Sequence, residues 1–134
     1  MDERTTIRVV AAVVQRDELY LVTQRRSEAV LGGLWEFPGG KVEAGETDEA
    51  ALHRELRERI GVDAVIGKQL AERHTAYPDY DVTLVLYTAT IDPEAAPRPL
   101  RVKDFRWIRS HDFADYPFPA ADQKTMDLLL GFRR

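Results

Sequence analysis

Two glutamates three residues apart are the feature of the sequence most suited to chemistry. Glu55 and Glu58 lie in a segment whose apolar residues recur every fourth position, as in an amphipathic helix. Because residues three apart project to one side of a helix, both carboxylates would lie beside the apolar stripe. Carboxylates placed in this way can share an oxygen-bound cation such as Mg²⁺ or Mn²⁺, and one of them can take a proton from an attacking water.

A glycine pair followed by a lysine precedes this segment. Gly39 and Gly40 come directly after Pro38, and Lys41 follows them. Glycine lets the backbone approach a ligand closely, and a lysine at this point could neutralise phosphate oxygens. Each feature also has a simpler interpretation. The glycines can form an ordinary turn, and the helix charges can form surface pairs four residues apart, Arg54 with Glu58 and Glu55 with Arg59.

The elements that must position these residues can be predicted from the same sequence. A helix is expected over Asp48–Ile60, with Thr47 as N-cap and Gly61 just past its C-terminus. Strands are expected over Ile7–Val14 and Leu19–Thr23 as a hairpin, and over Val62–Ile66, Leu70–Thr75, Val82–Ile91 and Val102–Ile108; Ala120–Phe132 is expected to form a C-terminal helix. This order predicts an α+β fold in which a mixed sheet is covered on both faces.

Composition narrows the class of protein. The 134 residues suffice for one domain, residues 1–134, and contain no cysteine, which excludes a disulfide framework and thiolate metal sites. A formal net charge of −4 makes a general affinity for nucleic acid duplexes unexpected, so a polyanionic substrate must be met locally by placed cations. No apolar run is long enough for a membrane span, and a cytoplasmic location is expected.

The spacing of the glycine, glutamate and arginine residues resembles the Nudix box, Gly-x5-Glu-x7-Arg-Glu-U-x-Glu-Glu-x-Gly-U, where U is apolar. The matching positions are Gly40, Glu46, Arg54, Glu55, Leu56, Glu58, Gly61 and Val62. The likeness extends beyond the box. Residues 35–41 (WEFPGGK) look like the approach segment of the MutT-type branch, and residues 77–79 and 118–122 look like its base-pocket segments.

This resemblance implies a Nudix-type α/β/α sandwich with a central Nudix helix and a C-terminal helix. It also implies an enzyme that uses Mg²⁺ (or Mn²⁺) to hydrolyse a nucleoside triphosphate to monophosphate and pyrophosphate, a reaction that can serve nucleotide pool sanitation. By matching position, the metal ligands would be Glu55, Glu58 and the Gly39 carbonyl, with Glu55 also a possible base. Arg54 and Glu46 would form the supporting ion pair, and Arg25 and Lys41 would contact phosphates.

The implied base pocket involves Tyr77 and Asp122. Tyr77 would flank the nucleobase, with a surface turn as the alternative, and Asp122 would accept hydrogen bonds from the edge of the base, with an N-cap role as the alternative. An ionised carboxylate only accepts hydrogen bonds, so it favours an edge that presents N–H groups. Oxidised purine nucleotides and cytidine or deoxycytidine nucleotides are therefore the expected candidates.

The sequence departs from the pattern at two positions. Arg59 stands where the box ends in a glutamate, and Arg101 stands where a further acidic residue often precedes the tryptophan of the last strand. One hypothesis is a working hydrolase that holds fewer metal ions while Arg59 touches phosphate. The other is a nucleotide-binding domain with weak or no turnover because Arg59 occupies Glu55. Nucleoside diphosphate sugars and dinucleoside polyphosphates remain alternative substrates, and the expected protein is a monomer or homodimer.

Overall fold

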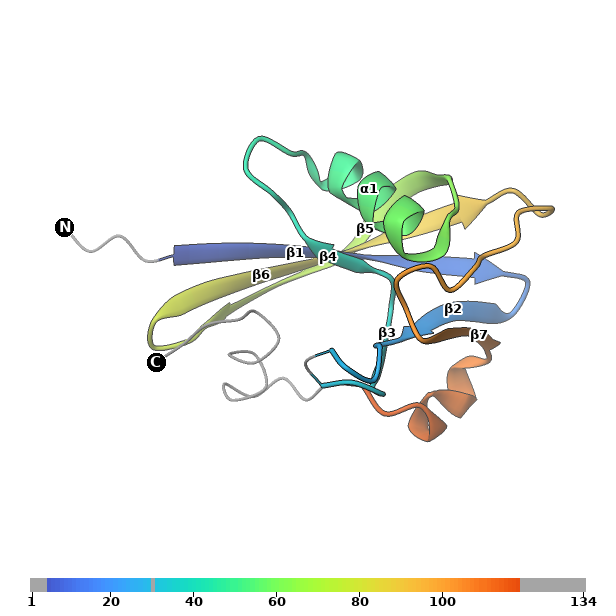
Figure 1. Cartoon of the computed structure of the whole chain (residues 1–134). Helices are drawn as coiled ribbons and strands as arrows, with labels where there is room; N and C mark the ends of the chain where they lie inside the picture. Colours follow the sequence, from blue (N-terminus) through green and yellow to red (C-terminus); the bar gives the residue numbers. More distant parts are fainter. Residues whose placement is uncertain (1–4, 30, 119–134) are drawn as a thin grey trace.

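The computed structural model describes residues 5–29 and 31–118 of the chain, and Figure 1 shows their arrangement. In chain order the described elements are strands β1 (Thr5–Arg16), β2 (Leu19–Gln24), β3 (Trp35–Glu36) and β4 (Gly39–Lys41), helix α1 (Asp48–Ile60), strands β5 (Ala64–Ala76), β6 (Tyr80–Ile91) and β7 (Asp104–Ile108), and a 3₁₀ helix over Ser110–Asp115. The predicted C-terminal helix, Ala120–Phe132, lies outside the described residues.

Strand β1 organises the sheet. It pairs in parallel with β6 and antiparallel with β4 and β2, while β5 extends the sheet antiparallel to β6. Strands β3 and β7 pair antiparallel with β2. The predicted mixed sheet and the predicted hairpin of the first two strands are therefore confirmed.

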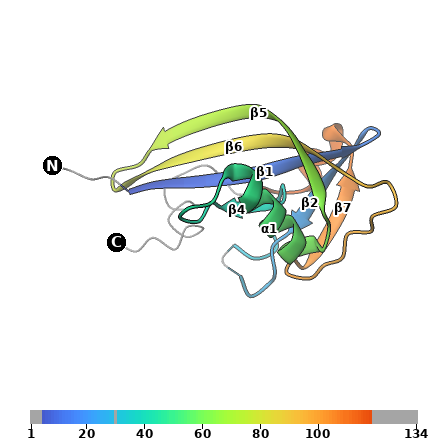
Figure 2. The same ribbon diagram turned by 90° about the horizontal axis from the view of Figure 1, so that it is seen from above.

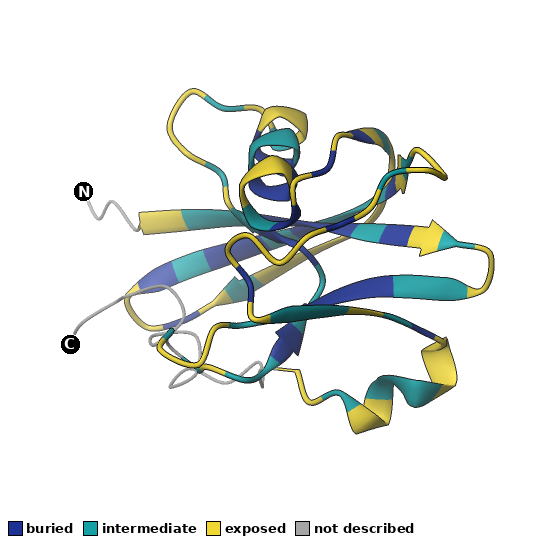
Figure 3. Ribbon diagram, turned by 45° about the vertical axis from the view of Figure 1, so that its right-hand side comes forward, coloured by how far each residue is buried: buried dark blue, intermediate teal, exposed yellow. Residues whose placement is uncertain are grey.

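Helix α1 covers one face of the part of the sheet formed by β4, β1, β6 and β5 (Figures 1 and 2). The predicted apolar stripe faces this sheet, since Leu52, Leu56 and Ile60 are fully buried and pack with Val10 and Val85 in one core. Figure 3 shows the same division along the helix, with buried residues toward the sheet and exposed ones outside. Burial of each such side chain contributes about 1.5–3 kcal/mol, so this stripe fixes the helix on the sheet.

The ends of α1 follow the predicted capping residues. The Thr47 hydroxyl accepts a hydrogen bond from Ala50 N at 3.1 Å, and Thr47 itself has an extended backbone. Gly61 has φ of 67°, and its N–H donates to Arg57 O at 3.1 Å. These caps satisfy backbone groups that a helix leaves unpaired at its ends, and they fix where Glu55 and Glu58 fall relative to the sheet.

The two short strands expected over Val62–Ile66 and Leu70–Thr75 form one strand, β5. Its pairing with β6 shifts register at two places between Ile66 and Ala71. A Cβ on Gly67 would lie 2.2 Å from the Thr88 hydroxyl oxygen, so only glycine lets the strand approach β6 so closely. The polar, glycine-containing stretch that resembled a break in the sequence is therefore an irregularity within a continuous strand.

Candidate active site

The carboxylate of Glu55 is buried against β4. Glu55 is 7% exposed, although it is charged, and it lies on the face of α1 that meets Gly40. A Cβ added to Gly40 would lie 2.6 Å from both Cδ and Oε1 of Glu55. The second glycine of the pair thus makes room for this carboxylate, so the glycine pair and the helix form one site, as their joint spacing predicts.

Arg54 ties the loop before α1 to this carboxylate. Its Nε and Nη2 donate to the two carboxylate oxygens of Glu46 at 2.8 and 3.0 Å, and its Nη1 donates to Glu55 Oε1 at 2.9 Å. The paired Arg54 guanidinium is the main cause that lowers the pKa of Glu46 to about 2, and the same pair raises the pKa of Arg54. Two parallel N–H···O bonds fix orientation as well as distance, so the pair predicted to orient Glu55 is present in the structure.

Two further arginines contact the carboxylates. Arg59 Nε donates to Glu55 Oε2, so both oxygens of Glu55 are paired with guanidinium groups. The more exposed carboxylate of Glu58 lies 3.7 Å from Arg54 Nη1 and 3.8 Å from Arg101 Nη1. The surface pairs predicted along the helix, Arg54 with Glu58 and Glu55 with Arg59, are therefore present. Arg101, which lies outside the helix, adds a further contact with Glu58.

The carbonyl of Gly39 has a suitable direction for a ligand of the same site. The Pro38 carbonyl faces β1 and accepts from Ala12 N at 2.8 Å, whereas the Lys41 carbonyl accepts from Arg54 Nη2 at 3.1 Å. Because carbonyls alternate between the two edges of a strand, the Gly39 carbonyl shares the edge of Lys41. Its edge is therefore the one nearest α1.

The donor atoms of this site suit a divalent metal ion, but the protein supplies fewer ligands than the ion needs. Glu55, Glu58 and the Gly39 carbonyl supply the hard oxygen donors that Mg²⁺ and Mn²⁺ prefer. Across residues 5–29 and 31–118, however, no three His, Cys, Asp or Glu side chains converge on one point. Two carboxylates and a backbone oxygen are what the protein offers here, and water and phosphate oxygens would have to complete the coordination.

The predicted substrate-binding residues are spread more widely. Arg25 donates from Nη1 to Glu36 Oε1 at 2.8 Å, while Lys41 adjoins the carboxylates through its backbone contact with Arg54. Tyr77 lies in the turn that leads from β5 to β6, and its side chain is 9% exposed, with its ring centroid 5.2 Å from that of Tyr80. Asp122 lies outside the described residues.

A partly buried ion pair at the start of α1 was not predicted from the sequence. Arg8 on β1 donates from Nε and Nη2 to the two oxygens of Asp48 at 2.6 and 2.7 Å, and the Tyr87 hydroxyl donates to Asp48 Oδ2 at 2.5 Å. Hydrogen bonding from Arg8 holds the pKa of Asp48 below its usual value, and burial raises the pKa of Tyr87. The signal in the sequence was a single arginine within an otherwise apolar strand.

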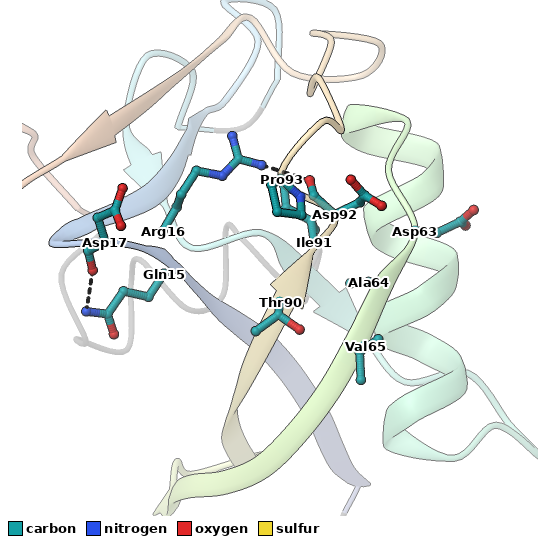
Figure 4. Close-up of a pocket in the computed structure, with 10 residues that line it drawn as sticks. All are labelled: Gln15, Arg16, Asp17, Asp63, Ala64, Val65, Thr90, Ile91, Asp92 and Pro93. Atoms are coloured by element: carbon teal, nitrogen blue, oxygen red, sulfur yellow. Dashed lines mark hydrogen bonds between the residues drawn. The ribbon is translucent and has the colours of Figure 1, made fainter.

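Two hollows lie apart from the carboxylates. One of about 790 Å³, shown in Figure 4, has the lining residues Gln15, Arg16, Asp17, Asp63, Ala64, Val65, Thr90, Ile91, Asp92 and Pro93. In it the Arg16 guanidinium donates to Asp92 O and stacks 4.6 Å from the ring centroid of Trp107. The other, of about 550 Å³, is aromatic and is lined by Phe37, Phe113, Ala114, Tyr116, Pro117 and Phe118. Neither set includes a residue predicted to bind metal, phosphate or base, but Phe118 of the aromatic hollow belongs to the predicted base-pocket segment 118–122.

Comparison with known proteins decides the family. The model of the NUDIX domain matches residues 9–128, which is most of the chain. The chain belongs to the Nudix family. The resemblance seen in the box is thereby confirmed, and the α+β fold with it.

Relatives and solved structures agree with this assignment. The Nudix chain is 32% identical over 127 residues to a CTP pyrophosphohydrolase of Escherichia coli, covering 95% of this chain and 93% of the relative. It is 32% identical over 131 residues to an 8-oxo-dGTP diphosphatase of Haemophilus influenzae, covering 96% and 95%. The solution structure of the E. coli ORF135 protein superposes with a TM-score of 0.74 at 30% identity, covering 97% of this chain and 92% of that one. The predicted enzyme class, a Nudix pyrophosphohydrolase, is the class of these named relatives.

Among residues 5–29 and 31–118, no helix has both the length and the apolar character needed to cross a bilayer.

Proposed function

We propose that this Nudix protein hydrolyses a nucleoside triphosphate to a monophosphate and pyrophosphate with the help of Mg²⁺ or Mn²⁺, and that residues 1–134 form a single domain. The observation that carries the proposal is the buried Glu55 carboxylate, seated against Gly40 and oriented by the Arg54–Glu46 pair. Burial of a carboxylate is costly unless charged partners compensate it, so a site built in this way indicates a role for that charge.

Glu55, Glu58 and the Gly39 carbonyl would hold the divalent ion. When bound, such an ion offsets the charge on phosphate oxygens and acidifies a water molecule. The other tasks fall to the chain itself. Arg54 and Glu46 keep the Glu55 carboxylate in place, and Lys41 and Arg25 would bind phosphate oxygens.

The chemical step is the addition of water to phosphorus. A bond forms between the water oxygen and phosphorus, the anhydride bond between the first and second phosphates breaks, and the water proton passes to a carboxylate. Glu55 is the carboxylate we assign as acceptor of that proton, with Glu58 as the second metal-binding group. Arg54 donates to Glu55 Oε1 and Arg59 donates to Oε2, so the reaction requires that one of these two hydrogen bonds be released.

For the base, we propose that Tyr77 flanks the nucleobase and that Asp122 accepts hydrogen bonds from its edge. The relatives named for CTP and for 8-oxo-dGTP agree with the two expected classes, cytidine nucleotides and oxidised purine nucleotides. These two classes separate in a direct comparison of CTP, dCTP, dGTP and 8-oxo-dGTP as substrates.

A second candidate function is supported by one observation. Both oxygens of Glu55 are paired with arginines, Arg54 and Arg59. A carboxylate held in this way could leave the protein as a nucleotide-binding domain with weak or no turnover. The two candidates differ in whether nucleotide binding is followed by release of pyrophosphate.

The deciding experiment measures pyrophosphate release from a panel of ribo- and deoxyribonucleoside triphosphates, including oxidised ones, with Mg²⁺ or Mn²⁺. We expect release from at least one nucleotide, and loss of that release with EDTA. Glu55→Gln should reduce turnover at least 100-fold, in the range seen when a catalytic group is removed. Glu49→Gln, at an exposed position of the same helix, is the matched control and should retain activity.

Calorimetric binding of a nucleotide with no release from any member of the panel would establish the second candidate instead. A panel with nucleoside diphosphate sugars and dinucleoside polyphosphates tests the remaining substrate classes.

A further inference from the structure

Arg59 and Arg101 contact the carboxylates near the C-terminal end of α1. Arg59 lies on the helix, and Arg101 lies in the loop between β6 and β7. Arg59 Nε donates to Glu55 Oε2, and Arg101 Nη1 lies 3.8 Å from Glu58 Oε2. Their side chains are 31% and 66% exposed, so both guanidinium groups can be reached from solvent. Each carboxylate that would hold a metal ion is thus paired with one arginine that a ligand can also reach.

The backbone fixes these two arginines next to each other. The N–H groups of Leu100 and Arg101 both donate to Arg59 O, at 3.1 and 3.0 Å. Arg98 N donates to Ile60 O at 2.9 Å, and Arg26 Nη2 donates to Leu100 O at 2.9 Å. The loop that carries Arg101 is therefore bound to the end of α1.

The carboxylates of the site are engaged by arginines before any ligand is present. Glu43, Glu46, Glu55 and Glu58 each lie within 3.8 Å of a guanidinium nitrogen of Arg54, Arg59 or Arg101, four negative groups against three positive groups. Arg54 is committed to Glu46 by two short hydrogen bonds, so it is the poorest candidate to move. A cation that took both Glu55 and Glu58 would displace Arg59 and Arg101, and would leave two guanidinium groups without anionic partners beside it.

A chain of phosphates is the ligand that such an exchange suits. Guanidinium presents several N–H donors in a plane that match the oxygens of a phosphate group, and it remains charged at any working pH. The released arginines would lie beside the bound cation, where the phosphates of the substrate must also lie. We propose that Arg59 and Arg101 are the phosphate-binding pair of this site, which hold Glu55 and Glu58 in the free protein and pass to phosphate oxygens when a divalent cation takes the carboxylates.

This proposal rests on the proposed function, and it makes Arg59 act in opposite senses on the two ligands. Arg59 competes with the cation for Glu55, and it attracts the phosphate chain. A residue that merely orients the carboxylate would support cation binding. A residue that merely blocks the carboxylate would not affect phosphate binding. Opposite changes in the two affinities on removal of Arg59 are therefore the signature of the exchange.

Two binding measurements test this without turnover. Binding of Mn²⁺ alone is followed by electron paramagnetic resonance of the free ion. Binding of inorganic tripolyphosphate is followed by calorimetry at saturating Mg²⁺, the condition in which the proposal has the arginines released from the carboxylates. For Arg59→Gln we expect Mn²⁺ to bind about tenfold more tightly and tripolyphosphate about tenfold more weakly. This is well below the full value of a charge contact, because solvent screens the part-exposed Arg59 side chain. Arg59→Lys keeps the charge and should restore part of the tripolyphosphate affinity.

Arg57→Gln is the matched control, because Arg57 is 65% exposed and pairs with Asp63. It should change each affinity less than about threefold, since its partner is Asp63 and not Glu55 or Glu58. Arg101→Gln, at a more exposed position, should move both affinities in the same directions as Arg59→Gln, and it provides the test if Arg59→Gln fails to fold. Weaker Mn²⁺ binding, or unchanged tripolyphosphate binding, in the folded variants would overturn the proposal. Absence of pyrophosphate release from the wild-type protein would refute the proposed function instead, so the two failures are distinguishable.

Discussion

Gly40→Ala tests whether the Glu55 carboxylate lies where the structure places it. The added Cβ would lie 2.6 Å from Glu55 Cδ and Oε1 and 2.9 Å from Oε2. Gly40 lacks the positive φ of Gly33, Gly45 and Gly61, so its backbone accepts alanine. The three atoms nearest to the new Cβ all belong to the Glu55 side chain, which hydrogen bonds from Arg54 and Arg59 hold in place.

The size of the effect follows from that contact. Carbon atoms in contact lie about 3.5–4.0 Å apart, so the carboxylate must move by about 1 Å. Overpacking of this kind costs about 1–3 kcal/mol, which for a domain of this size lowers the Tm by about 3–10 °C. A displacement of about 1 Å of a reacting group costs about 100-fold in rate. We therefore expect a folded protein with a modest loss of stability and a severe loss of activity.

The assay is a double-mutant cycle with Glu55→Ala, with thermal denaturation and pyrophosphate release measured for each variant. Without the carboxylate, the three atoms nearest to the alanine at position 40 are gone. Its cost should then fall by more than about 0.5 kcal/mol, the deviation from additivity that independent sites show. An equal loss of stability from Gly40→Ala in both backgrounds would show that the Glu55 carboxylate is not packed on Gly40. The stability arm gives this answer even for a protein without turnover.

Three further changes probe the supporting ion pairs. Tyr87→Phe removes the hydroxyl that donates to Asp48, and should lower the free energy of unfolding by about 1–2 kcal/mol in urea denaturation; an unchanged midpoint would contradict that hydrogen bond. The pKa of Asp48 is lowered in the folded state, chiefly by Arg8, so its stabilisation is complete above the ordinary pKa of 3.8 and is lost as the pH falls further. Asp48→Asn should therefore reduce the acid sensitivity of the Tm below about pH 4, and an identical pH profile would refute the assignment. Glu46→Gln removes the partner of Arg54 and should lower kcat about tenfold with little change in KM, whereas a change in KM alone would place Glu46 in substrate binding.

The sequence predicted α1 well because its signals are local. Capping residues act within one turn, and an apolar residue at every fourth position specifies which face is buried. The bounds Asp48–Ile60 and both caps are therefore confirmed. The division of β5 into two strands was wrong because the irregularity near Gly67 depends on Thr88 of the neighbouring strand, which no pattern along the chain reveals.

The candidate site could be predicted from the sequence only where its contacts are local. Glu55, Arg54 and Glu46 occupy fixed positions on one helix and the loop before it, so their spacing determines their contacts. The contact of Asp48 with Arg8 joins residues 40 positions apart, and only the packing of α1 across β1 brings them together. A tertiary contact of this kind is indicated in the sequence only by a residue that does not fit its surroundings, here the charged Arg8 within the apolar run Ile7–Val14.

Arg59 shows where such local reasoning ends. Its spacing from Glu55 requires an ion pair in the free helix, and the structure contains that pair. The pair alone does not determine function. The same contact would be seen if Arg59 permanently blocked Glu55 and if Arg59 released Glu55 when a cation binds. The backbone hydrogen bonds that hold Arg101 beside Arg59 favour release, since they keep a second guanidinium in place for the phosphates that follow the cation. A site that had only lost a carboxylate would not need a second arginine held at its edge. The directions in which the Mn²⁺ and tripolyphosphate affinities change can therefore distinguish a blocked Glu55 from one that Arg59 releases.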